Sequence, residues 1–265
     1  MNNLMRADLF KLSKLWSIKI LIGILFISAI LMTMISYSVA QGDAGQELGG
    51  LGALFSDLQM MSLIGSIIAG IFIVGDFKNK TIHDAISTGS SRGTLIAGKT
   101  MVYFILVALM ILPYALITSM AIFTTDHSYA VLVPSAFLNL LATSTGIEVT
   151  ALEVLKMIAI FLTVIIVYAG QLSIAVWIAF VLRKTVLVIL IGYGVSILSG
   201  QLRSLGDSVP MVEKILAFTP YGFDLTLLTL DAEVGVFFKG ITISLVFIAI
   251  ILTLTYVGFK KSEIN

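Results

Sequence analysis

The chain has 265 residues, of which 58% are hydrophobic and 12% are charged, and its mean hydropathy is +1.08. Soluble domains carry about 45–50% apolar and about 25% charged residues, so this composition excludes a water-soluble globule and a disordered chain. The net charge of +1 indicates no nucleic-acid partner. With no cysteine and two histidines, we expect neither disulfides, a metal site nor a cofactor.

Six apolar segments are each long enough to cross a bilayer, because a helix spanning about 30 Å of hydrocarbon needs about 20 apolar residues. We place them at about residues 18–42, 58–75, 100–125, 157–182, 185–202 and 240–259. Only Arg183 and Lys184 separate the fourth span from the fifth, which predicts a tight helical hairpin. The fold class is therefore all-α and integral to the membrane, with residues 1–265 forming a single transmembrane domain.

The basic residues indicate the orientation, because cytoplasmic loops of membrane proteins are enriched in Lys and Arg. If both termini are cytoplasmic, twelve of the sixteen basic residues face the cytoplasm. These are Arg6, Lys11, Lys14, Lys19, Lys78, Lys80, Arg92, Lys99, Arg183, Lys184, Lys260 and Lys261. We therefore expect both termini on the cytoplasmic side.

Residues 1–17 precede the first span and carry apolar residues at helical spacing. The apolar positions are Met5, Leu9, Leu12 and Trp16, and the basic ones are Arg6, Lys11 and Lys14. This pattern is typical of an interfacial helix lying in the inner headgroup layer of the lipid bilayer. A basic segment that only anchors the topology is an equally good interpretation.

Two motifs resemble catalytic signatures. Residues 93–100 match the phosphate-loop pattern, which requires a buried strand before it and a soluble helix after it, whereas here the motif leads into a span. Residues 89–93 match the nucleophile elbow, which needs a histidine and an acid converging on the serine. We interpret both matches as coincidences and expect no catalytic residue, so the chain is not expected to be an enzyme.

The segment 76–99 between the second and third spans is the most informative. Ile82, Ala85 and Ile86 recur at helical spacing, and Gly89 provides a helix stop. This predicts a short amphipathic helix against the cytoplasmic surface. The length of the segment favours a docking surface for a partner over a solvated basic loop that only fixes the topology.

The same segment resembles the membrane subunits of type-2 ABC transporters. The resemblance consists of an acid ending span two, an aromatic-Lys-x-Lys-Thr motif, a short helix, Thr-Gly, an Arg, and a Lys opening span three. These residues are Asp76, Phe77, Lys78, Lys80, Thr81, Thr88, Gly89, Arg92 and Lys99. With the basic start and the six-span layout, the resemblance covers essentially the whole chain. It is strongest to the short permeases of Gram-positive bacteria associated with bacitracin resistance, lantibiotic immunity and peptide export, although many members carry Gly at the position of Lys80.

The resemblance implies a mechanism in which two permease subunits, identical or homologous, pair in a bacterial cell membrane and two cytoplasmic ABC ATPase subunits dock on them. Residues 1–17 would be the elbow helix, and residues 77–87 would be the coupling helix received by an ATPase groove. The residues implied in coupling are Asp76, Phe77, Lys78, Lys80, Thr81, Ile82, Ile86, Gly89 and Arg92. ATP hydrolysis on the partner would then drive export of an amphipathic substrate, either a peptide or a lipid-like molecule.

The segment 203–236 contains two apolar stretches, residues 211–218 and 223–230, that are too short to span the membrane. Pro210 and the sequence at 220–222 interrupt them, so we expect re-entrant or interfacial helices near the outer face. The resembled family also has such helices.

Two other function classes stay open at this point. One is a non-transport scaffold or sensor that docks a cytoplasmic partner through the same loop. The other is a gradient-driven carrier, which the lack of charged residues near the span midpoints disfavours. Small residues at four-residue spacing, Gly192, Ser196 and Gly200 with Ser66 and Gly70, predict close helix packing within one subunit or between two.

Overall fold

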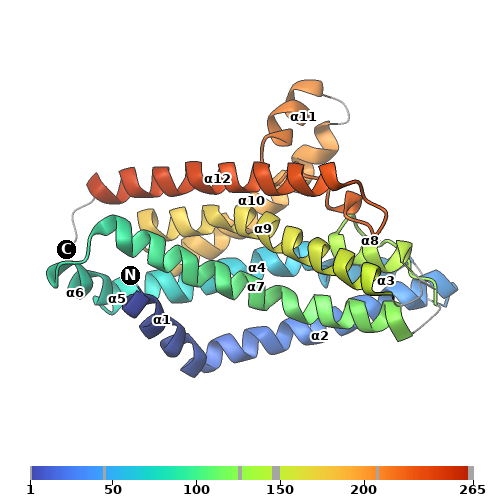
Figure 1. Cartoon of the computed structure of the whole chain (residues 1–265), viewed down its shortest axis with the longest axis horizontal. Coiled ribbons are helices and arrows are strands. Elements are labelled where there is room, and N and C mark those ends of the chain that lie inside the picture. The colour runs from blue at the N-terminus through green and yellow to red at the C-terminus, as the bar shows by residue number, and fades with distance from the viewer. Residues whose placement is uncertain (1, 44–45, 125–126, 145–149, 207–208, 262–265) are drawn as a thin grey trace.

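The computed structural model describes residues 2–43, 46–124, 127–144, 150–206 and 209–261. Helices make up 84% of the structure, and the described residues form no strand. Six of the helices in these ranges are long and apolar enough to cross a membrane, which confirms the predicted number of spans. The long helices lie side by side along the long axis of the molecule (Figure 1). This is the architecture of a multi-pass membrane protein.

The helices follow one another with short connections. In chain order they are α1 (Asn2–Lys14), α2 (Trp16–Gln41), α3 (Gln46–Leu54), α4 (Asp57–Ala69), the π-helix η1 (Gly70–Val74), α5 (Gly75–Lys78), α6 (Thr81–Ser87), α7 (Arg92–Thr124), α8 (Ala136–Thr143), α9 (Ala151–Leu182), α10 (Thr185–Gly206), α11 (Pro210–Ala217), the 3₁₀ turn η2 (Leu225–Leu227) and α12 (Val234–Lys261). The second span is continuous through α4, η1 and α5, because the backbone stays right-handed helical at Ala69, Gly70, Val74 and Gly75.

The first and last helices meet at the same end of the bundle. Lys99 of α7 pairs with Asp8 of α1, and Arg92 at the start of α7 donates a hydrogen bond to the carbonyl of Phe259 near the end of α12. Figure 1 shows α1, α6 and the last turns of α12 together at this end, with α3 and α8 at the other. We call the first the termini end and the second the far end.

Small residues bring α4 and α10 close together inside the chain. The hydroxyls of Ser62 and Ser196 are hydrogen-bonded at 2.7 Å. A Cβ added at Gly192 would lie 3.1 Å from the Cβ of Ser66, whereas one added at Gly200 would meet open space. Gly192 and Ser196 therefore pack within the subunit, and Gly200 does not take part in this contact.

The third span begins earlier than the sequence indicated. α7 starts at Arg92, so the segment between spans two and three ends at Ser91 instead of at residue 99. Residues 93–100 therefore lie in the first turns of a helix that continues into a span, and the described residues before them form no strand, whereas a phosphate-binding loop needs a strand before it and a soluble helix after it. The hairpin between α9 and α10 has the expected two-residue turn, in which Arg183 adopts a left-handed conformation with φ of 51°.

The helix at the N-terminus is shorter than residues 1–17. α1 ends at Lys14, the backbone of Leu15 is extended, and Trp16 opens α2 with 75% of its surface exposed. Trp16 is therefore not part of the first helix, contrary to the sequence-based expectation. Leu12 is buried, and Met5 and Leu9 pack against the core, so the apolar face of α1 is covered by the chain's own bundle.

Of the two apolar stretches expected before the last span, only the first forms a helix, α11. The second, at residues 223–230, contains only the turn η2, so a second short helix was a wrong expectation. The preceding turn is held against α9 instead: the side chain of Gln171 donates to the carbonyl of Pro220 at 3.0 Å, and the hydroxyl of Tyr221 donates to the carbonyl of Gln171 at 2.7 Å. The stretch that follows is thus fixed by its contacts and buries Phe223 without a helix.

Candidate functional site

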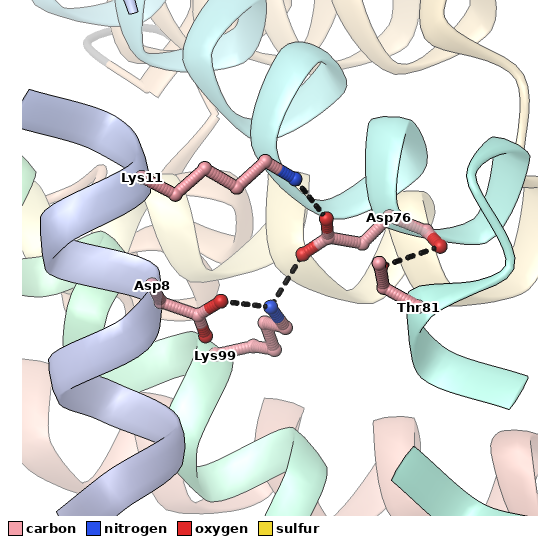
Figure 2. Close-up of polar contacts among 5 residues, drawn as sticks. All are labelled: Asp8, Lys11, Asp76, Thr81 and Lys99. Atoms are coloured by element: carbon pink, nitrogen blue, oxygen red, sulfur yellow. Dashed lines mark hydrogen bonds and ion pairs between the residues drawn. The ribbon is translucent and has the colours of Figure 1, made fainter. Parts of the chain in front are cut away.

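Four charged residues form a connected cluster at the termini end, which we call the charge cluster: Asp8, Lys11, Asp76 and Lys99 (Figure 2). The ammonium of Lys11 donates to Oδ1 of Asp76 at 2.5 Å, and the ammonium of Lys99 donates to Oδ1 of Asp8 at 2.6 Å. Lys99 also donates to Oδ2 of Asp76. The charges alternate along the chain of contacts and sum to zero.

Three helices supply the charge cluster. Asp8 and Lys11 lie one turn apart on α1, Asp76 lies on the short α5 that ends the second span, and Lys99 lies two turns into α7. The cluster therefore fastens the N-terminal helix to the ends of the second and third spans. Figure 2 shows the four side chains converging from these elements.

The charge cluster is buried at its centre and open at its edge. The side chains of Asp76 and Lys99 are 1% and 4% exposed, whereas that of Lys11 is 39% exposed. Burial raises the pKa of the Asp8 carboxyl above its ordinary value, and the Lys99 ammonium opposes this rise. Because a buried charge is tolerated only when it is paired, Lys99 is the residue on which both carboxylates depend.

An aromatic group lies next to the charge cluster and joins α5 to the last turns of two further spans. The ring of Phe77 lies 5.7 Å from that of Phe180 and 5.9 Å from that of Phe259, both edge-on. The guanidinium of Arg183 lies over the Phe77 ring at 4.8 Å. Phe77 is thus an internal contact between α5, α9 and α12.

Arg92 closes the last helix. Its guanidinium donates to the carbonyl oxygens of Phe259 and Lys260 at 2.8 Å and 2.7 Å. These carbonyls belong to the last turn of α12, where a cation is favoured because the carbonyls have no partner within the helix. Arg92 therefore ties the start of the third span to the end of the sixth.

The helix α6 is the expected short amphipathic helix. Ile82 is 1% exposed and Ile86 is half-buried, so the apolar face rests on the chain itself. Lys80 precedes the helix with φ of 58°, the hydroxyl of Thr81 donates to the carbonyl of Asp76 at 3.0 Å, and Gly89 follows the helix with φ of 96°. The exposed polar residues between positions 78 and 88 are Lys78, Asn79, Lys80, Thr81, His83, Asp84, Ser87 and Thr88.

The structure thus divides the residues expected to couple to a partner into two sets. Asp76, Phe77, Ile82 and Arg92 contact other parts of the same chain. The residues on the polar side of α6, with Lys78 and Lys80, are exposed, and the ammonium of Lys78 also donates to the hydroxyl of Thr185 on α10 at 3.3 Å. The exposed set is available for binding, and the other set connects it to the spans.

Sequence reasoning missed Asp8, although its position carried a signal. Asp8 lies three residues after Met5 and four residues before Leu12, and therefore on the apolar face of α1. An acid within an apolar stripe requires a buried partner. Its partner, Lys99, is 91 residues away and could not be read from spacing.

A second buried acid, Asp57, was also missed. It is fully buried at the start of α4, and one carboxylate oxygen accepts a hydrogen bond from the hydroxyl of Tyr168 at 2.6 Å. Asp57 thus joins α4 to α9, and α8 packs against α4 at the same end.

The charge cluster connects helices to one another. Among the described residues there is no group of three or more His, Cys, Asp or Glu placed to bind a metal ion. The ion pairs, the Phe77 contacts and the Arg92 cap link the exposed α6 to the ends of the first helix and of four spans. A displacement of α6 would therefore be passed to several spans together.

Comparison of the chain with protein-family models finds no match. Comparison with curated proteins finds no match either. The proposed function therefore rests on the fold and on the geometry of the termini end.

Proposed function

We propose that the chain is the membrane subunit of an ABC-type exporter, powered by a separate cytoplasmic ATPase that docks on α6. The observation that carries this proposal is the combination of an exposed polar helix surface with a buried set of contacts leading from it into the spans. A docking helix used to move other helices needs both properties. A loop that only fixed topology would need neither.

The resemblance to type-2 ABC permeases adds a second support. The residues of the motif that are buried, Asp76 and Lys99, are paired with each other. Lys80, which stands where many members carry Gly, has a left-handed backbone that glycine adopts without strain. The motif therefore has a physical explanation at these positions.

In this proposal the energy comes from outside the chain. Closure of two ATPase subunits would push on α6, and the charge cluster and Phe77 would pass the movement to α1, α7, α9 and α12. The substrate is an amphipathic molecule, because the spans are apolar. A second permease subunit, identical or homologous, would complete the pathway.

The test is purification of the tagged full-length chain from the membranes of its own host. We expect a soluble ATPase with nucleotide-binding motifs to co-purify, and the complex to hydrolyse ATP and to drive ATP-dependent uptake of an amphipathic fluorescent peptide into inverted vesicles. Absence of any such ATPase would contradict the proposal. An ATPase-free chain that still bound a cytoplasmic protein would support the scaffold or sensor class instead.

A charge reversal on α6 separates specific docking from fortuitous co-purification. Asp84 is exposed, and its carboxylate lies 3.9 Å from Nδ1 of His83, a long contact. We expect Asp84→Arg to lower ATPase retention about tenfold, the effect of losing one good interface contact. The matched control is Asp231→Arg, which reverses an exposed acid at the far end and is expected to leave retention unchanged. Equal effects of the two variants would exclude α6 as the docking site.

A further inference from the structure

A cavity of about 580 Å³ lies at the far end, between the last turns of α10, the helix α11 and the start of α12. A second cavity of about 280 Å³ adjoins it, and the two share Ala217, Gly222, Asp224 and Lys239. Binding sites for small molecules typically measure about 300–1,000 Å³. The space is therefore large enough for one small molecule or headgroup.

Charges of both signs line the larger cavity. Arg203 and Lys239 are the bases, and Glu213 and Asp224 are the acids, so the lining sums to zero. Arg203 and Asp224 are 3.8 Å apart, but Glu213 and Lys239 form no ion pair within the part of the chain that the structure describes. An occupant that carries one positive and one negative group would complement these two residues.

The wall of the cavity is fixed by specific contacts. The guanidinium of Arg203 donates to the carbonyl of Phe223 at 2.9 Å, and the carboxylate of Asp224 accepts hydrogen bonds from the backbone and hydroxyl of Thr226. The hydroxyl of Tyr221 donates a hydrogen bond to the carbonyl of Gln171 on α9, and burial raises the pKa of this hydroxyl. Gly222 lies so close to the carbonyl of Leu216 that no side chain would fit there. These side-chain hydrogen bonds and the close approach at Gly222 thus hold the wall of the cavity in shape.

An apolar surface adjoins the charged cavity. Helix α11 has no buried residue, and Met211, Ile215 and Phe218 are 71%, 59% and 81% exposed. Figure 1 shows α11 projecting beyond the side of the bundle. The cavity also lies where the fifth span ends and the sixth begins, and the ends of a spanning helix reach the headgroup region of a bilayer.

We propose that this cavity binds a zwitterionic phospholipid headgroup, with Lys239 facing the phosphate, Glu213 facing the ammonium, and the acyl chains lying along α11. A long amphipathic peptide fits less well, because the charged space holds only a single headgroup-sized group. This inference is independent of the proposed function, since the isolated chain needs no ATPase to bind a lipid.

The test measures lipid binding to the purified full-length chain by native mass spectrometry. Phosphatidylethanolamine is titrated against phosphatidylglycerol, which has the phosphate but no ammonium. We expect the zwitterionic lipid to bind about fivefold more tightly, the effect of one partly exposed ion pair. Soluble glycerophosphoethanolamine should displace the bound lipid, and glycerol should not.

Two variants locate the site. Lys239→Gln and Glu213→Gln should each weaken phosphatidylethanolamine binding about fivefold. Both residues are exposed, so folding is expected to persist, and thermal unfolding checks this. The control is Lys214→Gln, an exposed base on α11 that does not line the cavity. Equal binding of the two lipids, or an equal loss in the control, would overturn the proposal.

Discussion

Lys99 is the residue that holds the termini end together. It is almost fully buried and donates to the carboxylates of both Asp8 and Asp76, which belong to different helices. Removing it would leave two buried acids, one of them unpaired and the other retaining only the partly exposed Lys11. Within the charge cluster, Lys99 thus makes the buried ion pairs and Lys11 makes the peripheral one.

We expect Lys99→Met to lower the free energy of unfolding by about 3–5 kcal/mol, the cost of breaking a buried ion pair by removing one partner. Lys11→Met should cost less than about 1 kcal/mol, because the Lys11 side chain is partly exposed and its pair is screened by solvent. Thermal unfolding of the purified protein in detergent measures both. Similar losses in the two variants would show that Lys99 is not the central residue.

Lys80 is held in a left-handed conformation that costs a non-glycine residue about 1–2 kcal/mol. We expect Lys80→Gly to relieve part of this strain and Lys80→Val to increase it, because a β-branched side chain tolerates positive φ poorly. Hydrogen–deuterium exchange of the α6 amides reports the local opening. Exchange should be about 5–30-fold faster in Lys80→Val than in Lys80→Gly, and equal rates would contradict the strain.

At the scale of elements, the second span shows what sequence periodicity does not reveal. The five residues of η1 form a π-helix between α4 and α5, which rotates Asp76 and Phe77 relative to the preceding turns. Such π segments occur frequently at functional sites. Here the segment precedes the residues that connect α6 to the bundle, and a Cβ at Gly70 would lie 2.9 Å from a methyl carbon of Thr185 at the start of α10.

Two glycines on α10, Gly192 and Gly194, differ in their surroundings. Gly192 faces Ser66 closely, whereas an added Cβ at Gly194 would meet nothing within 4 Å. Gly192→Ala should cost about 1–3 kcal/mol through overpacking, and Gly194→Ala should be neutral or stabilising by up to about 1 kcal/mol. Detergent unfolding midpoints check both. A large loss at Gly194 would instead place that face against a second subunit.

The elements also differ in how far they could be predicted. The length and apolarity of the six spans were readable because each helix must satisfy its own backbone in lipid. The start of α7 at Arg92 could not be predicted in this way, because Arg92 and Lys99 are charged and a span normally excludes charged residues. Their partners, the carbonyls of α12 and the acids of α1 and α5, are what permit them to lie within the helix.

At the scale of the whole molecule, the two ends of the bundle differ in charge. The twelve basic residues named above as cytoplasmic lie in or next to α1, α5 and α6, in the first turns of α2 and α7, in the turn between α9 and α10, and at the end of α12. Lys156, Arg203 and Lys239 lie near the other ends of α9, α10 and α12, and Lys214 lies on α11. This asymmetry favours a cytoplasmic termini end. The absence of native cysteine makes the orientation directly testable by single-cysteine labelling.

We expect Lys214→Cys to react with a membrane-impermeant maleimide in intact cells. His83→Cys should react only after permeabilisation, because α6 lies at the termini end, whereas α11 lies well away from that end, beyond the side of the bundle (Figure 1). Both residues are exposed, so accessibility depends on sidedness alone. The reverse labelling pattern would show that the termini end faces outward, where a cytoplasmic ATPase cannot reach α6.

The sequence by itself determined that this is an all-helical chain with six spans, a two-residue hairpin turn and an amphipathic helix after the second span. These are local properties, since the length of an apolar segment, a helix stop and helical periodicity each depend on residues close together in the sequence. Only the tertiary structure decided that Asp8 and Asp76 share Lys99, that Gly192 packs within the subunit, and that residues 223–230 do not form a helix. The physical reason is that a buried polar group takes whichever partner the packing brings near, and such partners lie far away in the sequence: Lys99 is 91 residues from Asp8, and Tyr168 is 111 residues from Asp57.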